Sequence, residues 1–414
     1  MGPELLAYPF LFIAIFFESF ILVNLLSKPA RQARRRSLAE ISELPTVGII
    51  VPCYNEAATV AATCESLLAL TYPQEKLEVI LVDDGSKDET PSAMAQFRNN
   101  PRVKIIRKEN GGKHTALNAG IAATTAEIVG CLDADSFVEP DALSEMIPCF
   151  VEPIVAAATA AMSVHKPENM LQHMQHAEYN FGITLRHALA SVNGLYVTPG
   201  PFSLYRREIV RALGNFRHGH QTEDLEMALR LQSNGYRIEN APRARVYTKT
   251  PKTIPVLLRQ RTRWTTGFLR NILNEYRHLM GNRLHGALGM LVIPLACLGI
   301  ASSILAFGLA VFQGTTHALA AAEVRSGIPL SYALMPHGTF FDWFYFPSEL
   351  YLVLAACTVL FSLSFIAFGK KMSRTPGSLA SGLFSYLVLY GFIAPLWLIR
   401  SVADVTLNKK RTWR

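Results

Sequence analysis

Charged residues are scarce in this chain of 414 residues: Asp, Glu, Lys and Arg make up 17% of it, against roughly 25% in an average soluble protein. Half of the residues are hydrophobic. This balance argues against a wholly soluble protein and predicts membrane segments. No CxxC pair occurs among the six cysteines, and we interpret them as reduced, small apolar residues in a cytosolic domain and in lipid.

The basic residues are unevenly spread, although the formal net charge of +8 is modest for the length. Much of the excess lies in three clusters, at residues 28–36, 369–374 and 408–414. Nucleic-acid binders also carry such clusters, but each of these follows an apolar stretch. Flanking a bilayer explains them better, so we expect a lipid bilayer and no nucleic acid as a partner.

Four apolar stretches are long enough to cross a membrane as helices, and they cover residues 5–26, 284–313, 347–369 and 379–400. The first has no small-residue cleavage site, so we interpret it as a membrane span rather than a signal peptide. Basic residues follow it, and only the start amine precedes it. This asymmetry places the N-terminus outside and the next domain in the cytoplasm, with the plasma membrane as the location.

The charge rule cannot be satisfied by every basic cluster of the C-terminal region. Three crossings after residue 284 leave the cluster at 369–374 inside, as the charge rule prefers, but put the basic tail at 408–414 outside. Either one stretch does not cross or the tail is an exception, and three crossings remain our expectation. Glu18 lies in the middle of the first span; it could line a polar channel, pair with a small accessory subunit or sit in water near the surface.

Strands and helices alternate between residues 46 and 132. Helical periodicity covers 57–70 and 115–124, and the runs with strand character lie at 46–51, 77–82, 103–106 and 128–132. This alternation predicts a parallel sheet covered on both faces. Polar turns follow all four strand runs directly, and ligands of such sheets bind beyond the carboxyl ends of the strands. The turns are therefore expected to converge on one site.

Asp133 and Asp135 end the fourth strand run. In extended backbone, residues two apart point to the same side, so we expect both carboxylates to face the ligand crevice. Two carboxylates so close repel each other unless a cation sits beside them. Mg²⁺ takes one or two carboxylates together with substrate phosphates, which favours a divalent ion on a diphosphate. The alternative is a solvated loop or a helix N-terminal cap.

The other polar turns also allow two interpretations. Asp83 and Asp84 suit contacts to a uracil or ribose, or they belong to a simple turn and helix cap. Lys113 follows two glycines that permit close backbone approach and could reach a base or phosphate, although most lysines are merely solvated. Glu56 lies near a helix N-terminus, where a carboxylate is favoured in any case.

Taken together, the motifs resemble a known family. VPCYNE, VDDGSKD, GGKHTALN, DADS, TPGPFSLYRR, QTEDLEM and QRTRW occur in the order found in membrane-embedded family-2 glycosyltransferases, the synthases of hyaluronan, chitin, cellulose and poly-N-acetylglucosamine. The resemblance covers roughly residues 45–270. It implies an α/β GT-A domain, a Rossmann-like nucleotide-diphospho-sugar transferase, with transmembrane helices at both ends. The expected division is 1–27 as the first span, 28–253 as the cytoplasmic catalytic domain, 254–283 as amphipathic interface helices and 284–414 as the membrane region.

The resemblance also implies roles for individual residues. Asp83 and Asp84 would hold the uridine of a UDP-sugar with Glu56 and Lys113 nearby, and Asp133 and Asp135 would bind Mg²⁺ or Mn²⁺, with Asp135 the direct ligand. In the TED motif, Glu223 and Asp224 would lie on the acceptor side, with Asp224 the general base. The QRTRW motif would place four residues at the pyrophosphate and acceptor channel: Gln260, Arg261, Arg263 and Trp264.

Each of these motifs has a simpler alternative. The acidic residues of TED could be an exposed helix start with Thr222 as its cap, and Trp264 could anchor a membrane interface. Arg261 stands where the family often has Gln, which bears on the type of product. Several bacterial members have a second N-terminal span, and cellulose synthase has a cyclic-dinucleotide domain; neither is evident here.

The expected function is an inverting, processive transfer of a sugar, N-acetylglucosamine by preference, from a UDP-sugar to a growing polysaccharide that is exported through the membrane region. One alternative is a non-processive transferase that adds one sugar to a lipid or glycolipid acceptor. The other is a catalytically silent membrane scaffold that only binds nucleotide.

Overall fold

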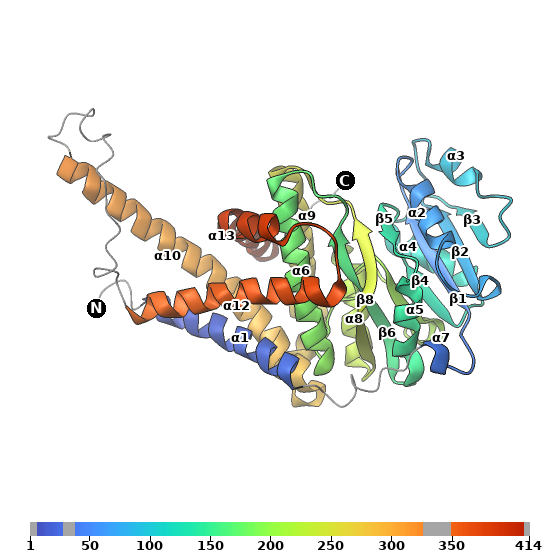
Figure 1. Cartoon of the computed structure of the whole chain (residues 1–414), viewed down its shortest axis with the longest axis horizontal. Coiled ribbons are helices and arrows are strands. Elements are labelled where there is room, and N and C mark those ends of the chain that lie inside the picture. Colours follow the sequence, from blue (N-terminus) through green and yellow to red (C-terminus); the bar gives the residue numbers. More distant parts are fainter. Residues whose placement is uncertain (1–5, 28–37, 326–348, 410–414) are drawn as a thin grey trace.

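A mixed sheet forms the centre of one half of the molecule (Figure 1). The computed structural model describes residues 6–27, 38–325 and 349–409. In this part of the chain the sheet has eight strands in the order β3-β2-β1-β4-β7-β6-β8-β5. The strands are β1 (Val47–Cys53), β2 (Leu77–Asp83), β3 (Val103–Arg107), β4 (Ile128–Cys131), β5 (Ser136–Val138), β6 (Val155–Val164), β7 (Ser203–Arg206) and β8 (Arg237–Thr248).

The predicted parallel sheet corresponds to strands β1 to β4, and this prediction is confirmed. β1 pairs in parallel with both β2 and β4, and β2 pairs in parallel with β3. Beyond β4 the direction changes, because β7 runs antiparallel to both β4 and β6. The carboxyl ends of β1, β2 and β4 therefore lie together at one edge, as expected.

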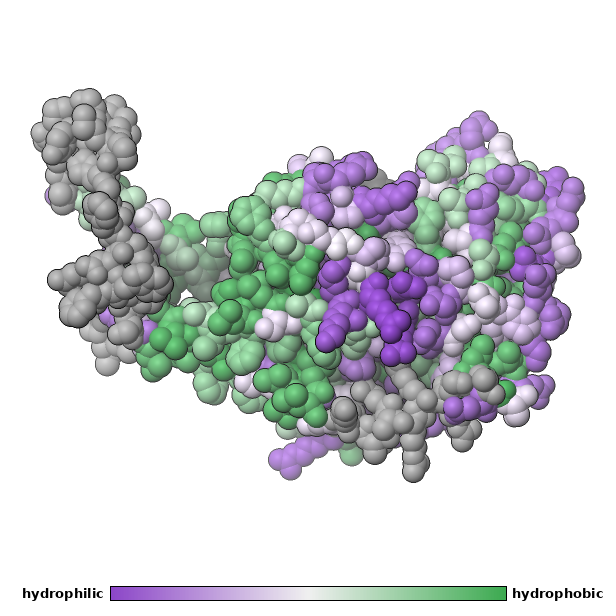
Figure 2. Space-filling model, viewed as in Figure 1, coloured by the Kyte–Doolittle hydropathy of each residue, from purple (hydrophilic) through white to green (hydrophobic). Residues whose placement is uncertain are grey.

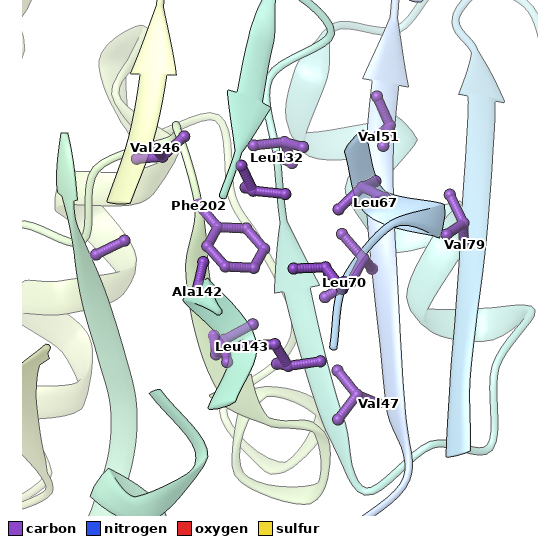
Figure 3. Packing of buried hydrophobic residues seen from close by; sticks show 14 of the residues in the cluster. Val47, Val51, Leu67, Leu70, Val79, Leu132, Ala142, Leu143, Phe202 and Val246 are labelled. Carbon is purple, nitrogen blue, oxygen red and sulfur yellow. The ribbon is translucent and has the colours of Figure 1, made fainter. Parts of the chain in front are cut away.

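Helices cover both faces of the sheet. Alternate residues of β1 enter opposite clusters: Ile49 packs with α2 (Val60–Leu68) and α5 (Ala142–Met146), whereas Ile50 packs with α4 (Lys113–Ala122) and α8 (Glu223–Ser233). Figure 3 shows the first cluster, which includes Val51, Leu67, Leu143 and Phe202. Two short helices complete the layers, α3 (Thr90–Ala95) and α7 (Arg207–Ala212). Burial on both faces explains why the strands read as continuous apolar runs.

Two long helices join the sheet to the apolar half of the molecule, α6 (Met170–Ser191) and α9 (Ile254–Arg270). α6 begins at Asn169, whose side chain accepts a hydrogen bond from the Gln172 N–H. It contacts β6 and β8 and also the apolar helices that follow. The amphipathic segment expected at 254–283 is helical as α9 up to Arg270, and a wider turn of helix follows at Asn271–Glu275. No element expected from the sequence corresponds to α6.

Four helices in the described part of the chain are long and apolar enough to cross a membrane. They are α1 (Tyr8–Leu26), α10 (Ile293–Arg325), α12 (Leu350–Ser373) and α13 (Leu379–Thr406). In Figure 2 hydrophobic residues dominate the half that contains these helices, and hydrophilic residues dominate the sheet half. The expected apolar stretches thus form helices. The basic cluster at 28–36 and most of the tail at 408–414 lie outside the described residues.

The four apolar helices do not share one direction. Figure 1 shows α1, α10 and α12 running across the view, whereas α13 is seen nearly end-on. α13 packs against α6 and α9, and its buried residues include Trp397 and Ser401. It is therefore strongly inclined to α12, the helix that precedes it in the chain.

Glu18 lies inside the helical bundle. Its side chain is buried, and the Ser362 hydroxyl of α12 donates a hydrogen bond to Glu18 Oε1 at 2.8 Å. This burial contradicts the alternative in which Glu18 sits in water near the surface. The contact joins α1 to α12, and Glu18 is not among the residues that line the large cavity described next.

Candidate active site

A single cavity of about 1460 Å³ opens at the carboxyl ends of β1, β2 and β4 and continues between α6, α1 and α10. It brings together all the predicted site residues except Asp83 and Arg261. Those that line it are Glu56, Asp84, Lys113, Asp133, Asp135, Glu223, Asp224, Gln260, Arg263 and Trp264. Polar turns from distant points of the chain therefore do converge, as the strand pattern indicated.

Asp133 and Asp135 both line the cavity, but the reason given for it was wrong. β4 ends at Cys131, and the two aspartates lie in a turn closed by a hydrogen bond from the Ser136 N–H to the Asp133 carbonyl at 3.0 Å. The carboxylates converge because the chain bends, not because it is extended. Neither is fully exposed, so the solvated-loop alternative does not describe them.

The surroundings of Asp135 suit a cation. Burial and, to a smaller extent, the neighbouring carboxylates of Asp133 and Glu56 together raise the pKa of Asp135 to about 7. Burial also raises the pKa of Glu56, against a hydrogen bond from Thr59. A divalent ion would relieve this repulsion. Within the described residues, no group of three or more His, Cys, Asp or Glu side chains is arranged to hold a metal.

Lys113 links the two acidic motifs. Its ammonium lies 2.5 Å from Asp133 Oδ1 and 3.1 Å from Glu223 Oε1. Burial opposes the charge on Lys113, but Asp133 and Glu223 outweigh it and hold its pKa well above the usual value. Burial likewise opposes ionisation of Glu223, and Lys113 more than compensates, so the pKa of Glu223 is lowered. Lys113 thus keeps Glu223 ionised at neutral pH.

Asp224 has the environment of a general base. Its Oδ2 accepts from the Gly200 N–H at 3.1 Å and its Oδ1 from the Leu225 N–H at 2.8 Å, at the start of α8. Burial and the adjacent Glu223 raise the pKa of Asp224, and Lys113 lowers it. The net pKa is about 6. The carboxylate is therefore mostly ionised at neutral pH and still basic enough to accept a proton. Glu223 is buried, so the exposed-helix-start alternative does not hold.

Gly200 brings the loop before β7 against these groups. A Cβ atom at this position would lie 2.6 Å from Lys113 Nζ and 3.0 Å from Asp133 Oδ2. A side chain there would displace the flexible end of Lys113, so glycine lets the backbone approach both the ion pair and Asp224 without disturbing them. The sequence analysis quoted TPGPFSLYRR as a motif but gave Gly200 no role.

Asp84 organises the glycine turn that precedes α4. Its two oxygens accept hydrogen bonds from the backbone N–H groups of Gly111 and Gly112, at 3.0 and 2.9 Å, and Lys108 lies 2.7 Å from Oδ1. Gly112 has a φ of 89°, which favours glycine. Asp83 does not reach the cavity: its Oδ1 accepts from the Ser86 N–H, and Arg107 lies 3.2 Å from Oδ2. Asp83 therefore fixes the turn after β2.

The QRTRW motif lies on α9, where Gln260, Arg263 and Trp264 face the cavity. Arg263 donates to the Gln221 carbonyl at 2.7 Å, next to the TED motif. Gln260 Oε1 is buried without a hydrogen-bond partner among the described residues, so it is available to a ligand donor.

Arg261 does not line the cavity. It is buried, pairs with Glu178 of α6 at 2.8 Å and lies 4.2 Å from the ring centre of Trp264 and 5.6 Å from that of Tyr179. Trp264, Glu178 and Tyr179 do line the cavity. Arg261 therefore holds these three lining residues in position from outside the cavity. The sequence analysis missed Glu178 and Tyr179 because their helix, α6, went unrecognised.

The comparisons with known proteins agree with this geometry. The family model described as glycosyl transferase family 2 matches residues 48–214, so the chain contains a glycosyltransferase family 2 domain, and its sheet and helices form a GT-A fold. Over these residues the match agrees with the family-2 domain expected from the motifs. The four apolar helices further indicate a membrane protein.

Among curated proteins, the chain is similar to poly-beta-1,6-N-acetyl-D-glucosamine synthase of Staphylococcus epidermidis, with 31% identity over 241 residues, 58% of this chain and 58% of the relative. The enzyme of the same description from Staphylococcus aureus strain COL is 32% identical over 239 residues, 57% of this chain. The chain thus matches 58% of the length of these relatives.

A solved structure of mannosyltransferase PcManGT from Pyrobaculum calidifontis, in complex with GDP-Man and Mn²⁺, matches with a TM-score of 0.59 and 21% identity. The match covers 97% of this chain and 100% of that one. At this identity the likeness concerns the fold, and it extends over the apolar helices as well as the sheet.

Proposed function

We propose that this protein transfers N-acetylglucosamine from UDP-N-acetylglucosamine to a growing saccharide, with inversion at the anomeric carbon and in repeated cycles. The observation that carries the proposal is the convergence of Asp133, Asp135 and Asp224 on one cavity that continues into the apolar half. The similarity to poly-beta-1,6-N-acetyl-D-glucosamine synthases supports the choice of sugar.

The donor would bind at the carboxyl ends of the parallel strands, the edge at which open α/β sheets bind ligands. The glycine turn held by Asp84 would approach the nucleoside, and Arg263 and Lys113 would face the diphosphate, with Asp133 and Asp135 holding a divalent cation. When bound, Mg²⁺ or Mn²⁺ neutralises charge that develops on the departing diphosphate.

Asp224 would take the proton of the acceptor hydroxyl as that oxygen attacks the anomeric carbon. A transfer with inversion needs one such base and no enzyme nucleophile. The Gly200 N–H holds Asp224 Oδ2 and the Leu225 N–H holds Oδ1, which keeps the carboxylate in place between turnovers. Trp264, stacked on Arg261, offers a fixed aromatic face for the acceptor sugar.

The decisive assay uses the full chain in detergent with UDP-N-acetylglucosamine and Mg²⁺ or Mn²⁺, and follows both UDP release and product length. We expect a ladder of products from the wild type and a rate lower by about 10²–10⁴-fold in Asp224→Asn, which keeps the shape but loses the base. A single addition would favour a non-processive transferase. UDP release that persists in Asp224→Asn would contradict the base assignment, and none from the wild type with any UDP-sugar would favour a nucleotide-binding scaffold.

We also propose that α13 lies in the membrane interface, so that only α1, α10 and α12 cross. Its strong inclination to α12 (Figure 1) and its packing on α6 and α9 support this arrangement. The basic tail at 408–414 then stays on the side of the sheet domain, which satisfies the charge rule. Labelling of a cysteine placed at position 408 should match that of one placed in the sheet domain; protection from the opposite side would contradict the proposal.

A further inference from the structure

The membrane end of the cavity contains a cation that has no anionic partner. Arg186 of α6 lines the cavity, and its Nε and Nη2 atoms are buried without a hydrogen-bond partner in the part of the chain that the structure describes. Burial lowers the pKa of Arg186 to about 10, so the group stays protonated at neutral pH. The groups that interact with it electrostatically are two phenols, those of Tyr179 and Tyr196.

Within the described residues, no carboxylate forms an ion pair with Arg186. The cavity-lining carboxylate on the same helix is Glu178, eight residues before Arg186, or about 12 Å along the helix axis. Glu178 is moreover occupied by Arg261 at 2.8 Å. Arg186 as a whole is half-buried, but leaving its Nε and Nη2 atoms buried without a partner is unfavourable, and an incoming anion would remove this cost.

The walls around Arg186 indicate what carries that anion. From α1 the cavity is lined by Phe10, Ile13 and Phe17, and from α10 by Leu295, Gly299 and Ile300. A Cβ atom at Gly299 would meet no other atom, so the space beside α10 is open there. Both helices are long and apolar enough to cross a membrane. Hydrocarbon, rather than a free polar ion, fits such walls.

We propose that Arg186 binds the phosphate of a lipid whose chain lies between α1 and α10, and that this lipid carries the acceptor saccharide. A neutral sugar chain could satisfy the N–H donors of Arg186 but would leave its charge unbalanced. A phosphate matches both the charge and the planar fork of the guanidinium. The saccharide would extend from Arg186 past Tyr179 toward Asp135, since Tyr179 interacts electrostatically with both.

The claim that the lipid carries the acceptor saccharide rests on the proposed transfer reaction. Binding of the lipid to Arg186 can be measured without that reaction. The first experiment measures binding to the full chain in a non-ionic detergent by native mass spectrometry and thermal unfolding. The three probes are dioleoylphosphatidic acid, the uncharged dioleoylglycerol and inorganic phosphate. We expect tight binding of the first and much weaker binding of the other two.

Arg186→Gln should weaken phosphatidic acid binding by about 10- to 100-fold, the effect of losing a charge-assisted hydrogen-bond pair. Arg186→Lys should restore part of it. Arg259→Gln, which removes an exposed arginine of α9, is the matched control and should bind like the wild type. Because Arg186 makes no ion pair or hydrogen bond within the described residues, its replacement should not unfold the protein.

Three results would overturn the lipid site: equal binding by Arg186→Gln, equal binding of dioleoylglycerol, or binding of inorganic phosphate as tight as that of the lipid.

For the acceptor, a polyprenyl-phosphate-linked saccharide should be elongated by the wild type and far more slowly by Arg186→Gln, with an unchanged KM for UDP-N-acetylglucosamine. A raised donor KM instead would assign Arg186 to the donor. If the wild type binds the lipid but releases no UDP, the proposed function fails and the lipid site stands.

Discussion

The acid limb of the pH–rate profile tests the assignment of Asp224 directly. Burial and the adjacent Glu223 raise the pKa of Asp224 from 3.8 to about 6. A carboxyl with this pKa is about nine-tenths ionised near pH 7 and about one-tenth ionised near pH 5. The rate at saturating donor and acceptor should therefore fall about tenfold over that interval, and about tenfold for each further unit of acid.

Lys113 sets the position of this limb, because its ammonium lowers the pKa of Asp224. Lys113→Met should move the limb to higher pH, whereas Lys113→Arg, which keeps the charge, should leave it close to the wild type. UDP release measured across the pH range at saturating metal gives the profile, since a bound cation keeps Asp135 ionised. A rate that stays flat between about pH 5 and pH 7 would refute the reasoning.

Three further outcomes follow from the site. Asp135→Asn should abolish the dependence of the rate on Mg²⁺ or Mn²⁺ together with most of the activity; an unchanged metal titration would exclude it as a ligand. Gly200→Ala should lower the rate at least about tenfold, because the alanine Cβ would displace the end of the Lys113 side chain. The unfolding temperature should change little, because that end is flexible. Wild-type activity in this variant would show that the loop can move. Arg261→Gln leaves Glu178 unpaired and should lower the free energy of unfolding by about 3 kcal/mol. This is the lower end of the range for breaking a buried ion pair, because Glu178 is 21% exposed. An unchanged unfolding midpoint would contradict this expectation.

The sequence predicted the part of the fold whose pattern is local. Strand runs separated by single helices identify β1 to β4 as a parallel unit, and the polar turns after them locate the site. The strands β6, β7 and β8 gave no such signal, because their pairing partners lie far apart in the chain: β6 pairs with β8, about 80 residues later. Long-range pairing of this kind is not encoded in any local periodicity.

Residue roles were predictable where a motif carried them and not elsewhere. Asp224 and Lys113 stand in motifs, and both face the cavity. Arg261 stands in one too, yet its position behind Trp264 depends on Glu178, a residue of a helix that the motifs do not include. Arg186 had no signal at all in the sequence, since a single arginine becomes unusual only when its surroundings are known to lack an anion.

The double role of α6 has a practical consequence for work on this protein. One side of this helix rests on the sheet and the other on α12 and α13, and residues of its cavity side contribute to the catalytic pocket. Removal of the hydrophobic segments to obtain a water-soluble fragment would strip one side of α6 and loosen Glu178 and Tyr179. The choice of solubilising agent is accordingly an enzymological variable, and turnover should be compared across detergents and lipid discs before any kinetic constant is assigned to the protein.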